Sequence, residues 1–169
     1  MPTMLQRLLP AALLFTLLVA LPACNGDAPD RAADMDFRGA EVAEVTISPR
    51  GNQLRFEQTE FTVRPGQTVR LTMDNVAQSP AMVHNVLIVN SNDDEEVNRV
   101  GRAALRAGRD RDYIPDDDAV IASTPQAQPG EVTDVEFTAP DEPGDFRYIC
   151  TYPGHFSVMQ GVMRVQETD

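Results

Sequence analysis

Between residues 41 and 166, short segments rich in β-branched residues alternate with turns made from proline, glycine and asparagine. In residues 68–73, Val69, Leu71 and Met73 alternate with polar residues, which is the period of a strand buried on one face. Pro65-Gly66 and Pro129-Gly130 are among the turn signals between such segments. Expected strands cover residues 42–47, 54–56, 61–63, 68–73, 86–89, 119–122, 132–137, 144–149 and 161–166. Many short strands with such turns predict an all-β fold, a Greek-key β-sandwich or barrel.

One stretch interrupts this pattern with the signals of a helix. Asp93 is a candidate N-cap, and acidic residues follow it in the first turn. An apolar stripe then recurs at helical spacing, and Gly108 is placed to end the helix. The stripe consists of Val97, Val100, Ala104 and Leu105. We therefore expect one helix of about four turns, packed on the sandwich as a flap.

The N-terminal residues have the features of an export signal. Arg7 precedes an apolar run over residues 8–21 that is too short to span a bilayer. Leu21-Pro22-Ala23-Cys24 resembles a bacterial lipobox, in which the cysteine carries the lipid, although Cys24 could also follow an ordinary cleavage site. We expect a lipoprotein signal peptide over residues 1–23, a flexible tether over 24–40 and one folded domain over 41–169. The domain would then be anchored to the membrane, on the periplasmic or outer face.

The chain is acidic, with 26 Asp and Glu against 14 Lys and Arg and a formal net charge of −12. This charge argues against nucleic acid as a partner, because phosphate binding needs basic patches. It is compatible both with simple solubility and with steering toward a basic redox protein.

Residues 150–159 bring together a thiol, an imidazole and a thioether within ten positions. The residues are Cys150, His155 and Met159. A thiolate selects Cu(I), imidazole suits either oxidation state of copper, and a thioether can serve as a weak axial ligand. Cys150 also has no disulfide partner if Cys24 is lipidated, and a lone thiol in an oxidising compartment is either inert or protected by a metal.

A further ligand must come from elsewhere in the chain. His84 and His155 are the two histidines of the sequence, so His84 is the candidate. Each residue also has a structural interpretation: Cys150 as a small buried hydrophobe, His84 as a core histidine, and Met163 in place of Met159. Their combination favours a copper site.

These residues resemble the type 1 copper site of the cupredoxins, in particular azurin and auracyanin. Cys150-Thr151-Tyr152-Pro153-Gly154-His155 is close to the ligand loop of azurin, and the resemblance extends over residues 42–166. It implies one type 1 copper ion with His84, Cys150 and His155 as equatorial ligands and Met159 as axial ligand. Val83 replaces a glycine of azurin, which leaves open whether its carbonyl oxygen contacts the copper.

The resemblance also suggests roles for residues around the ligands. Asn85 would tie the His84 strand to the ligand loop through Thr151, and Pro153-Gly154 would form the turn that brings His155 to the metal. Met82, Tyr152 and Phe156 would surround the site with an apolar surface for a redox partner.

The function predicted from these features is single-electron transfer between exported or membrane-bound redox proteins, such as cytochromes or a terminal oxidase. An enzyme is disfavoured, because a catalytic copper site needs further histidines and a Cys150 nucleophile would need a substrate cleft. No small-molecule substrate is expected. The alternative is a module that scavenges or delivers copper.

Overall fold

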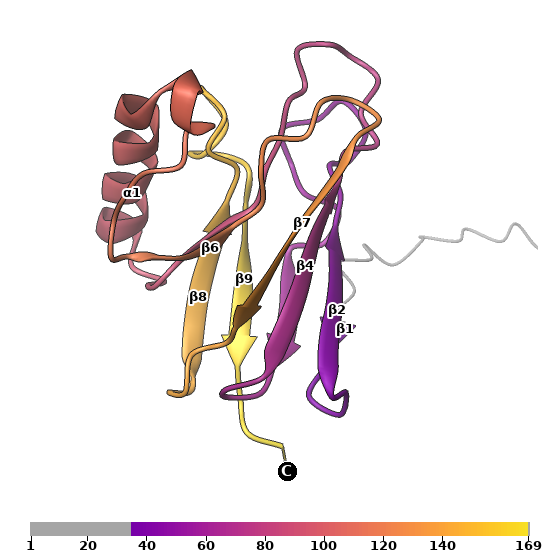
Figure 1. The fold of residues 1–169 in the computed structure, drawn as a ribbon, viewed down its shortest axis with the longest axis vertical. Coiled ribbons are helices and arrows are strands. Elements are labelled where there is room, and N and C mark those ends of the chain that lie inside the picture. Colours follow the sequence, from indigo (N-terminus) through magenta and orange to yellow (C-terminus); the bar gives the residue numbers. More distant parts are fainter. Residues whose placement is uncertain (1–34, 169) are drawn as a thin grey trace, which may run out of the picture.

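The computed structural model describes residues 35–168, which form two β-sheets packed face to face with one long helix outside them (Figure 1). The strands are β1 (Met35–Asp36), β2 (Val42–Ile47), β3 (Glu60–Val63), β4 (Thr68–Asp74), β5 (Leu87–Val89), β6 (Val120–Ser123), β7 (Val132–Thr138), β8 (Gly144–Ile149) and β9 (Gln160–Val165). The helices are α1 (Asp94–Ala107) and a short 3-10 helix, η1 (Arg109–Arg111).

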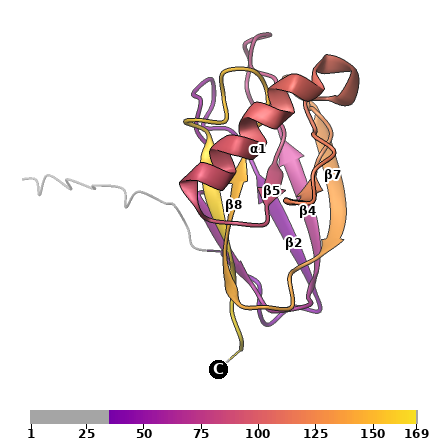
Figure 2. The same ribbon diagram turned by 90° about the vertical axis from the view of Figure 1, so that its left-hand side faces the viewer.

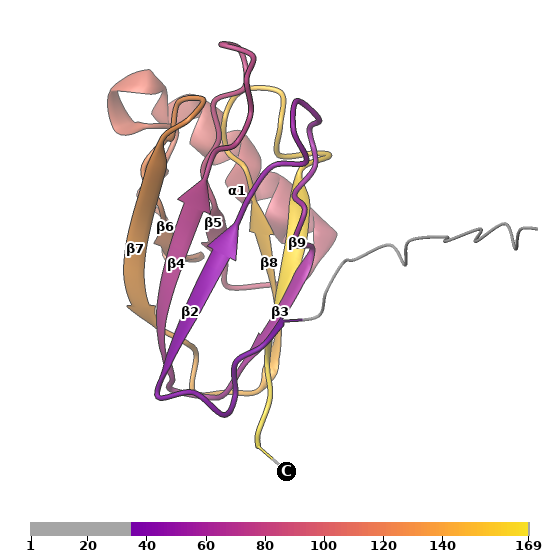
Figure 3. The ribbon, with the colours of Figure 1, turned by 90° about the vertical axis from the view of Figure 1, so that its right-hand side faces the viewer.

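The two sheets differ in size. The larger has the strand order β1-β3-β9-β8-β5-β6 and the smaller the order β2-β4-β7. Three pairs, β1 with β3, β2 with β4 and β3 with β9, are parallel, whereas the other pairs are antiparallel. Figure 3 shows β2, β4 and β7 side by side in front of the larger sheet, with α1 on the far side. The predicted β-sandwich is confirmed.

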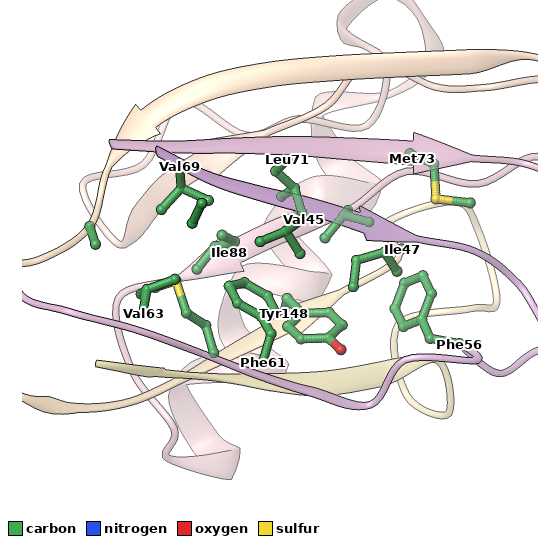
Figure 4. Packing of buried hydrophobic residues seen from close by; sticks show 14 of the residues in the cluster. Val45, Ile47, Phe56, Phe61, Val63, Val69, Leu71, Met73, Ile88 and Tyr148 are labelled. Carbon is green, nitrogen blue, oxygen red and sulfur yellow. The ribbon is translucent and has the colours of Figure 1, made fainter. Parts of the chain in front are cut away.

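The main hydrophobic core lies between the two sheets. Figure 4 shows Val45, Leu71 and Met73 pointing from the smaller sheet toward aromatic residues of the larger one. Tyr148 is fully buried there, and its hydroxyl donates a hydrogen bond of 2.6 Å to the carbonyl oxygen of Gln58. The alternation predicted for residues 68–73 is therefore the buried face of β4, with Val69, Leu71 and Met73 all inaccessible to solvent.

The strand predicted over residues 54–56 is wrong. These residues belong to the connection between β2 and β3, where Phe56 forms an isolated bridge with Pro49. Phe56 is buried against Tyr148, but Leu54 is exposed. The prediction failed because the apolar residues of this segment belong to a turn-rich connection, which places the ring of Phe56 in the core without forming a strand.

The predicted helix is confirmed as α1. The Asp93 side chain accepts hydrogen bonds from the backbone N–H groups of Glu95 and Glu96, at 3.0 and 3.1 Å, and Gly108 follows the last helical residue. Val97, Val100 and Ala104 are buried, whereas Leu105, predicted on the same stripe, is 40% exposed. The error follows from the helical period, because residue 105 lies about 100° round the axis from residue 104.

A second hydrophobic cluster lies between α1 and the outer face of the larger sheet (Figure 2). It contains Leu87 and Val89 from β5, Ile149 from β8, and Val97 and Val100 from α1. An ion pair adds to this docking, since the Arg99 guanidinium contacts Glu96 and, at 2.6 Å, Asp117 before β6. The hydrogen bonds that Arg99 donates to Asp117 lower the pKa of the Asp117 carboxyl group to about 2.

The folded domain begins before the predicted boundary. Met35 and Asp36 pair with Phe61 and Thr62 of β3, so residues 35–40 are not part of a tether. The side chain of Gln67 holds this segment by donating hydrogen bonds to the carbonyl oxygens of Phe37 and Ala40. Because these hydrogen bonds use backbone carbonyl groups of residues 37 and 40, the amino-acid sequence of the segment shows no periodic pattern that would predict them.

The predicted signal peptide, Cys24 and most of the predicted tether lie outside the described residues. Along residues 35–168, no helix is both long and apolar enough to cross a bilayer.

Candidate metal centre

Three of the four predicted ligands converge at one end of the sandwich. His84 lies between β4 and β5, Cys150 directly follows β8, and His155 lies in the ligand loop, defined as residues 150–159. The Nδ1 atoms of His84 and His155 are 3.6 and 3.5 Å from Sγ of Cys150. All three residues are buried, with 6% exposure of His155 as the largest value.

The spacing of these donor atoms fits a single metal ion. In zinc sites, metal to sulfur bonds of about 2.3 Å and metal to nitrogen bonds of about 2.0 Å occur. Bonds of that length at angles of 110° to 120° put sulfur and nitrogen roughly 3.5 to 3.7 Å apart. The two observed sulfur to nitrogen distances fall within this interval. One thiolate and two imidazoles, with Met159 buried at the end of the same loop, form the donor set of copper electron-transfer sites.

His84 is held by the backbone of its own segment. It forms an isolated antiparallel bridge with Ala127, in which each backbone N–H donates to the other residue's carbonyl oxygen, at 3.1 and 2.8 Å. Val83, Asn85 and Val86 are buried with it. The Nε2 atom of His84 is buried without a hydrogen-bond partner among the residues that the structure describes. Nδ1 is therefore the nitrogen directed at Cys150, and the backbone sets its position.

Asn85 connects the His84 segment to the ligand loop. Its Oδ1 accepts a hydrogen bond of 2.8 Å from the backbone N–H of Thr151, and its Nδ2 donates to the Thr151 hydroxyl at 2.8 Å. Both residues are completely buried. Asn85 follows the ligand His84, and Thr151 follows the ligand Cys150. The hydrogen bonds between Asn85 and Thr151 therefore link the two ligand-bearing segments.

The ligand loop folds back on itself through a tight turn. The backbone N–H of His155 donates to the carbonyl oxygen of Tyr152 at 3.0 Å, and Gly154 has φ of +86°. Proline followed by a residue with positive φ is the pattern of a type II turn. Met159 closes the loop, because its carbonyl oxygen accepts from the Cys150 N–H at 3.1 Å. Met163, the other predicted candidate, lies inside β9 opposite Phe61 and Phe146.

Burial sets the charges of the metal-free site. It raises the pKa of the Cys150 thiol to about 12, against the opposing effect of backbone hydrogen bonds from Asn85 and Tyr152. It lowers the pKa of His84 to about 4, with repulsion from His155 adding to the effect, and it also lowers the pKa of His155. Near neutral pH, the thiol is therefore protonated and both imidazoles are neutral. Metal binding must displace the thiol proton.

The residues predicted to form the partner surface have different positions. Met82 and Tyr152 are half-buried beside the site. Phe156 packs on α1 as part of the second hydrophobic cluster, so its ring faces the helix. Val158, which was not predicted, is 59% exposed in the ligand loop. An exposed valine between two ligands could have been recognised as surface from its position in the loop.

Tyr152 stands between His155 and a cavity. Its ring centroid lies 5.1 Å from that of His155 and 5.8 Å from that of Tyr113, which it meets edge to face. The cavity has a volume of about 290 Å³, and Val83, Tyr113 and Gln126 line it together with Tyr152.

Comparison with known proteins gives the family of this arrangement. Residues 43–166 match the model of the copper-binding proteins of the plastocyanin/azurin family. Auracyanin-A of Chloroflexus aurantiacus is 35% identical over 160 residues, covering 94% of this chain and 96% of that protein. Its structure, described as that of a "blue" copper protein, superposes with a TM-score of 0.68 and covers 74% of this chain and 99% of the other.

Two further relatives extend the comparison. Azurin of Pseudomonas aeruginosa is 31% identical over 132 residues, covering 74% of this chain and 87% of azurin. Outer membrane protein H.8 of Neisseria gonorrhoeae is 32% identical over 96 residues, covering 56% of this chain and 50% of that protein.

Proposed function

The chain belongs to the plastocyanin/azurin family of copper-binding proteins and is a blue copper electron carrier, and from this premise we propose that it works as an exported, lipid-anchored shuttle. Its type 1 copper site consists of His84, Cys150, His155 and Met159. The protein is not an enzyme, and its function requires redox proteins as partners.

The observation that carries the assignment is the convergence of two Nδ1 atoms on Sγ of Cys150 in a buried site. When bound, copper supplies a one-electron couple between Cu(II) and Cu(I). The protein fixes the donors through the Ala127 bridge to His84 and the Asn85 bonds to Thr151. Because the fold positions the donors, the protein would hold them in nearly the same places for both oxidation states, and electron transfer would require little rearrangement.

The face around His155 is the proposed contact for redox partners. Val158 is exposed there, and Pro153 and Gly154 of the turn are exposed beside it. The loop between β4 and β5, which carries Met82, lies at the same end of the sandwich as the ligand loop (Figures 1 and 3). Partners such as cytochromes or a terminal oxidase would meet apolar surface over the buried imidazole of His155.

A pair of charge substitutions tests this face. Val158→Asp should slow electron exchange with a c-type cytochrome and leave the visible spectrum unchanged. Thr138→Asp adds the same charge at the end of β7, which points toward the opposite end of the sandwich (Figure 1), and should leave the rate unchanged. Equal rates for the two variants would refute this docking face.

The same cytochrome assay separates an electron carrier from a copper delivery module. The copper-loaded protein should exchange electrons rapidly and retain its metal when incubated with a copper chelator of moderate affinity. Loss of copper to the chelator without electron exchange would favour delivery instead.

Lipid attachment at Cys24 is proposed from the lipobox resemblance of residues 21–24. The similarity to a protein named as an outer membrane protein supports a location in the cell envelope. Growth with labelled fatty acid should label the native protein and Cys150→Ser, but not Cys24→Ala. Label on Cys24→Ala, or on none of the three proteins, would reject the anchor.

A further inference from the structure

We propose that helix α1 holds the ligand loop in position, and that Gly101 and Phe156 are the positioning residues through which it does so. The proposal rests on the assignment of His155 and Met159 as ligands. The flap would then have a role at the metal centre as well as covering one face of the sheet.

The ring of Phe156 lies directly against the helix at Gly101. A Cβ atom added there would lie 2.7 Å from Cγ and 2.8 Å from Cε2 of the Phe156 ring, too close for any real side chain. Glycine inside a helix costs about 1 kcal/mol relative to alanine. The helix therefore accepts an unfavourable residue at a position where the ring of Phe156, the neighbour of His155, rests on it.

The residues on either side of the Cys150 to His155 part of the ligand loop, Ile149 and Phe156, pack on the same cluster. Ile149, which precedes Cys150, is fully buried in the second hydrophobic cluster, and Phe156 packs on that cluster from the other end. Val97 and Val100 of α1 form the opposite side of the cluster. The spacing between Cys150 and His155 is thus bounded by two residues that contact one helix-covered patch (Figure 2).

A polar connection joins the backbone of Phe156 to the start of α1. Nε2 of Gln160 donates to the Phe156 carbonyl oxygen at 2.6 Å, and Arg147 donates to Oε1 of Gln160 at 2.6 Å. Arg147 also donates to Oδ1 of Asn92 at 2.9 Å and to Oδ1 of Asp94 at 3.2 Å. The side chain of Phe156 therefore contacts α1 directly. Its backbone is connected to the start of α1 through the hydrogen bonds of Gln160 and Arg147.

Two properties of the metal-free protein test the contact without relying on copper. Gly101→Ala should lower the unfolding midpoint in the native background, because the methyl group displaces the ring. In a Phe156→Ala background, the same change should raise the midpoint, because only the better helix propensity remains. Amide exchange of residues 155–159 should become faster in Gly101→Ala. Gly39→Ala, where a Cβ would meet no atom within 4 Å, is the matched control.

The copper-loaded protein supplies the readout that a purely structural contact would not change. Gly101→Ala and Gln160→Ala should each shift the reduction potential and the thiolate-to-copper absorption band, while Gly39→Ala should not. Phe156→Leu should return Gly101→Ala toward the native potential, because the smaller side chain makes room for the methyl group.

Three results would overturn the proposal that α1 holds the ligand loop in position. They are a change of the same sign in both backgrounds, unchanged loop exchange, or an unchanged potential in Gly101→Ala despite lost stability. Failure of the native protein to form a blue site would instead reject the copper assignment, so the two failures are distinguishable.

Discussion

The two sides of the copper site are supported in different ways. The segment 83–86, which supplies His84, is buried throughout and bridged to Ala127. The ligand loop supplies the other three ligands, yet Pro153, Gly154, Ser157 and Val158 are exposed within it. One buried ligand thus comes from a segment that is buried throughout, and three buried ligands come from a loop that is partly exposed. A loop can hold ligands accurately when its ends and its bridging residue, Thr151, are fixed by neighbours that are themselves buried.

The largest effect is expected from removing the thiolate on the loop side. Cys150→Ser should abolish the intense thiolate-to-copper band of the oxidised protein, because a hydroxyl oxygen cannot replace soft sulfur. The visible spectrum measures this directly. Ser157→Ala, an exposed position in the same loop, should keep the band. An intense band in Cys150→Ser would contradict the type 1 site.

The next effect concerns the buried side in the absence of metal. His84 has a pKa of about 4 in the folded protein against 6.5 as its ordinary value, so the unfolded chain binds the additional proton between these values. Stability of the metal-free protein is therefore lost as the pH falls from 6.5 toward 4, and His84 contributes about 3 kcal/mol of this loss.

Urea unfolding of the metal-free protein at pH 7 and pH 4 measures that loss. His84→Gln should lose about 3 kcal/mol less over the same interval, because the depressed titration is gone. Parallel losses in the two proteins would show that burial does not hold His84 neutral.

A smaller effect is expected from removing the hydrogen bonds that connect the His84 segment to the ligand loop. Asn85→Ala leaves the Thr151 N–H buried without its acceptor, which should lower the free energy of unfolding by about 2 kcal/mol. Chemical denaturation measures the change. Asn98→Ala, which removes an exposed bond from the Asn98 amide to the Asp94 carbonyl oxygen, should cost less than half as much. Equal costs would mean that the bridge adds nothing beyond an ordinary surface contact.

The smallest structural change concerns Met159, the thioether ligand of the site. Met159→Leu conserves volume and should retain copper while shifting the reduction potential upward, because a thioether is replaced by a hydrocarbon. Voltammetry of the loaded protein measures the shift. Met163→Leu, inside β9, should leave the potential near its native value. A shift in Met163→Leu alone would reverse the assignment.

The sequence predicts the elements whose signals are local. The cap at Asp93, the glycine at 108 and the alternation in residues 68–73 each act within a few positions, and the structure contains all of them. The ligands were also predictable, since the chain has only two cysteines and two histidines, and Met159 lies in the same loop as Cys150 and His155. By contrast, the strand assigned to 54–56 relied on apolar residues in a segment without ladder partners.

Contacts between distant segments were not predictable. Nothing near residue 37 announces that Gln67 will bind its carbonyl oxygen. Likewise, Phe156 was predicted to lie on the surface because the helix that covers it begins more than 60 residues earlier, and nothing near Gly101 in the sequence indicates that an aromatic ring lies against it. Such features depend on the assembled fold.

For a domain anchored by lipid at Cys24, as proposed, the pairing of β1 with β3 would limit how far the domain can lie from the bilayer. Met35 is fixed to the sandwich edge, and even a fully extended chain from Cys24 to Met35 would span at most about 40 Å. A domain anchored in this way would stay within a thin layer above the bilayer. Membrane-bound partners within that layer would meet it at a higher effective concentration than proteins that diffuse freely in solution.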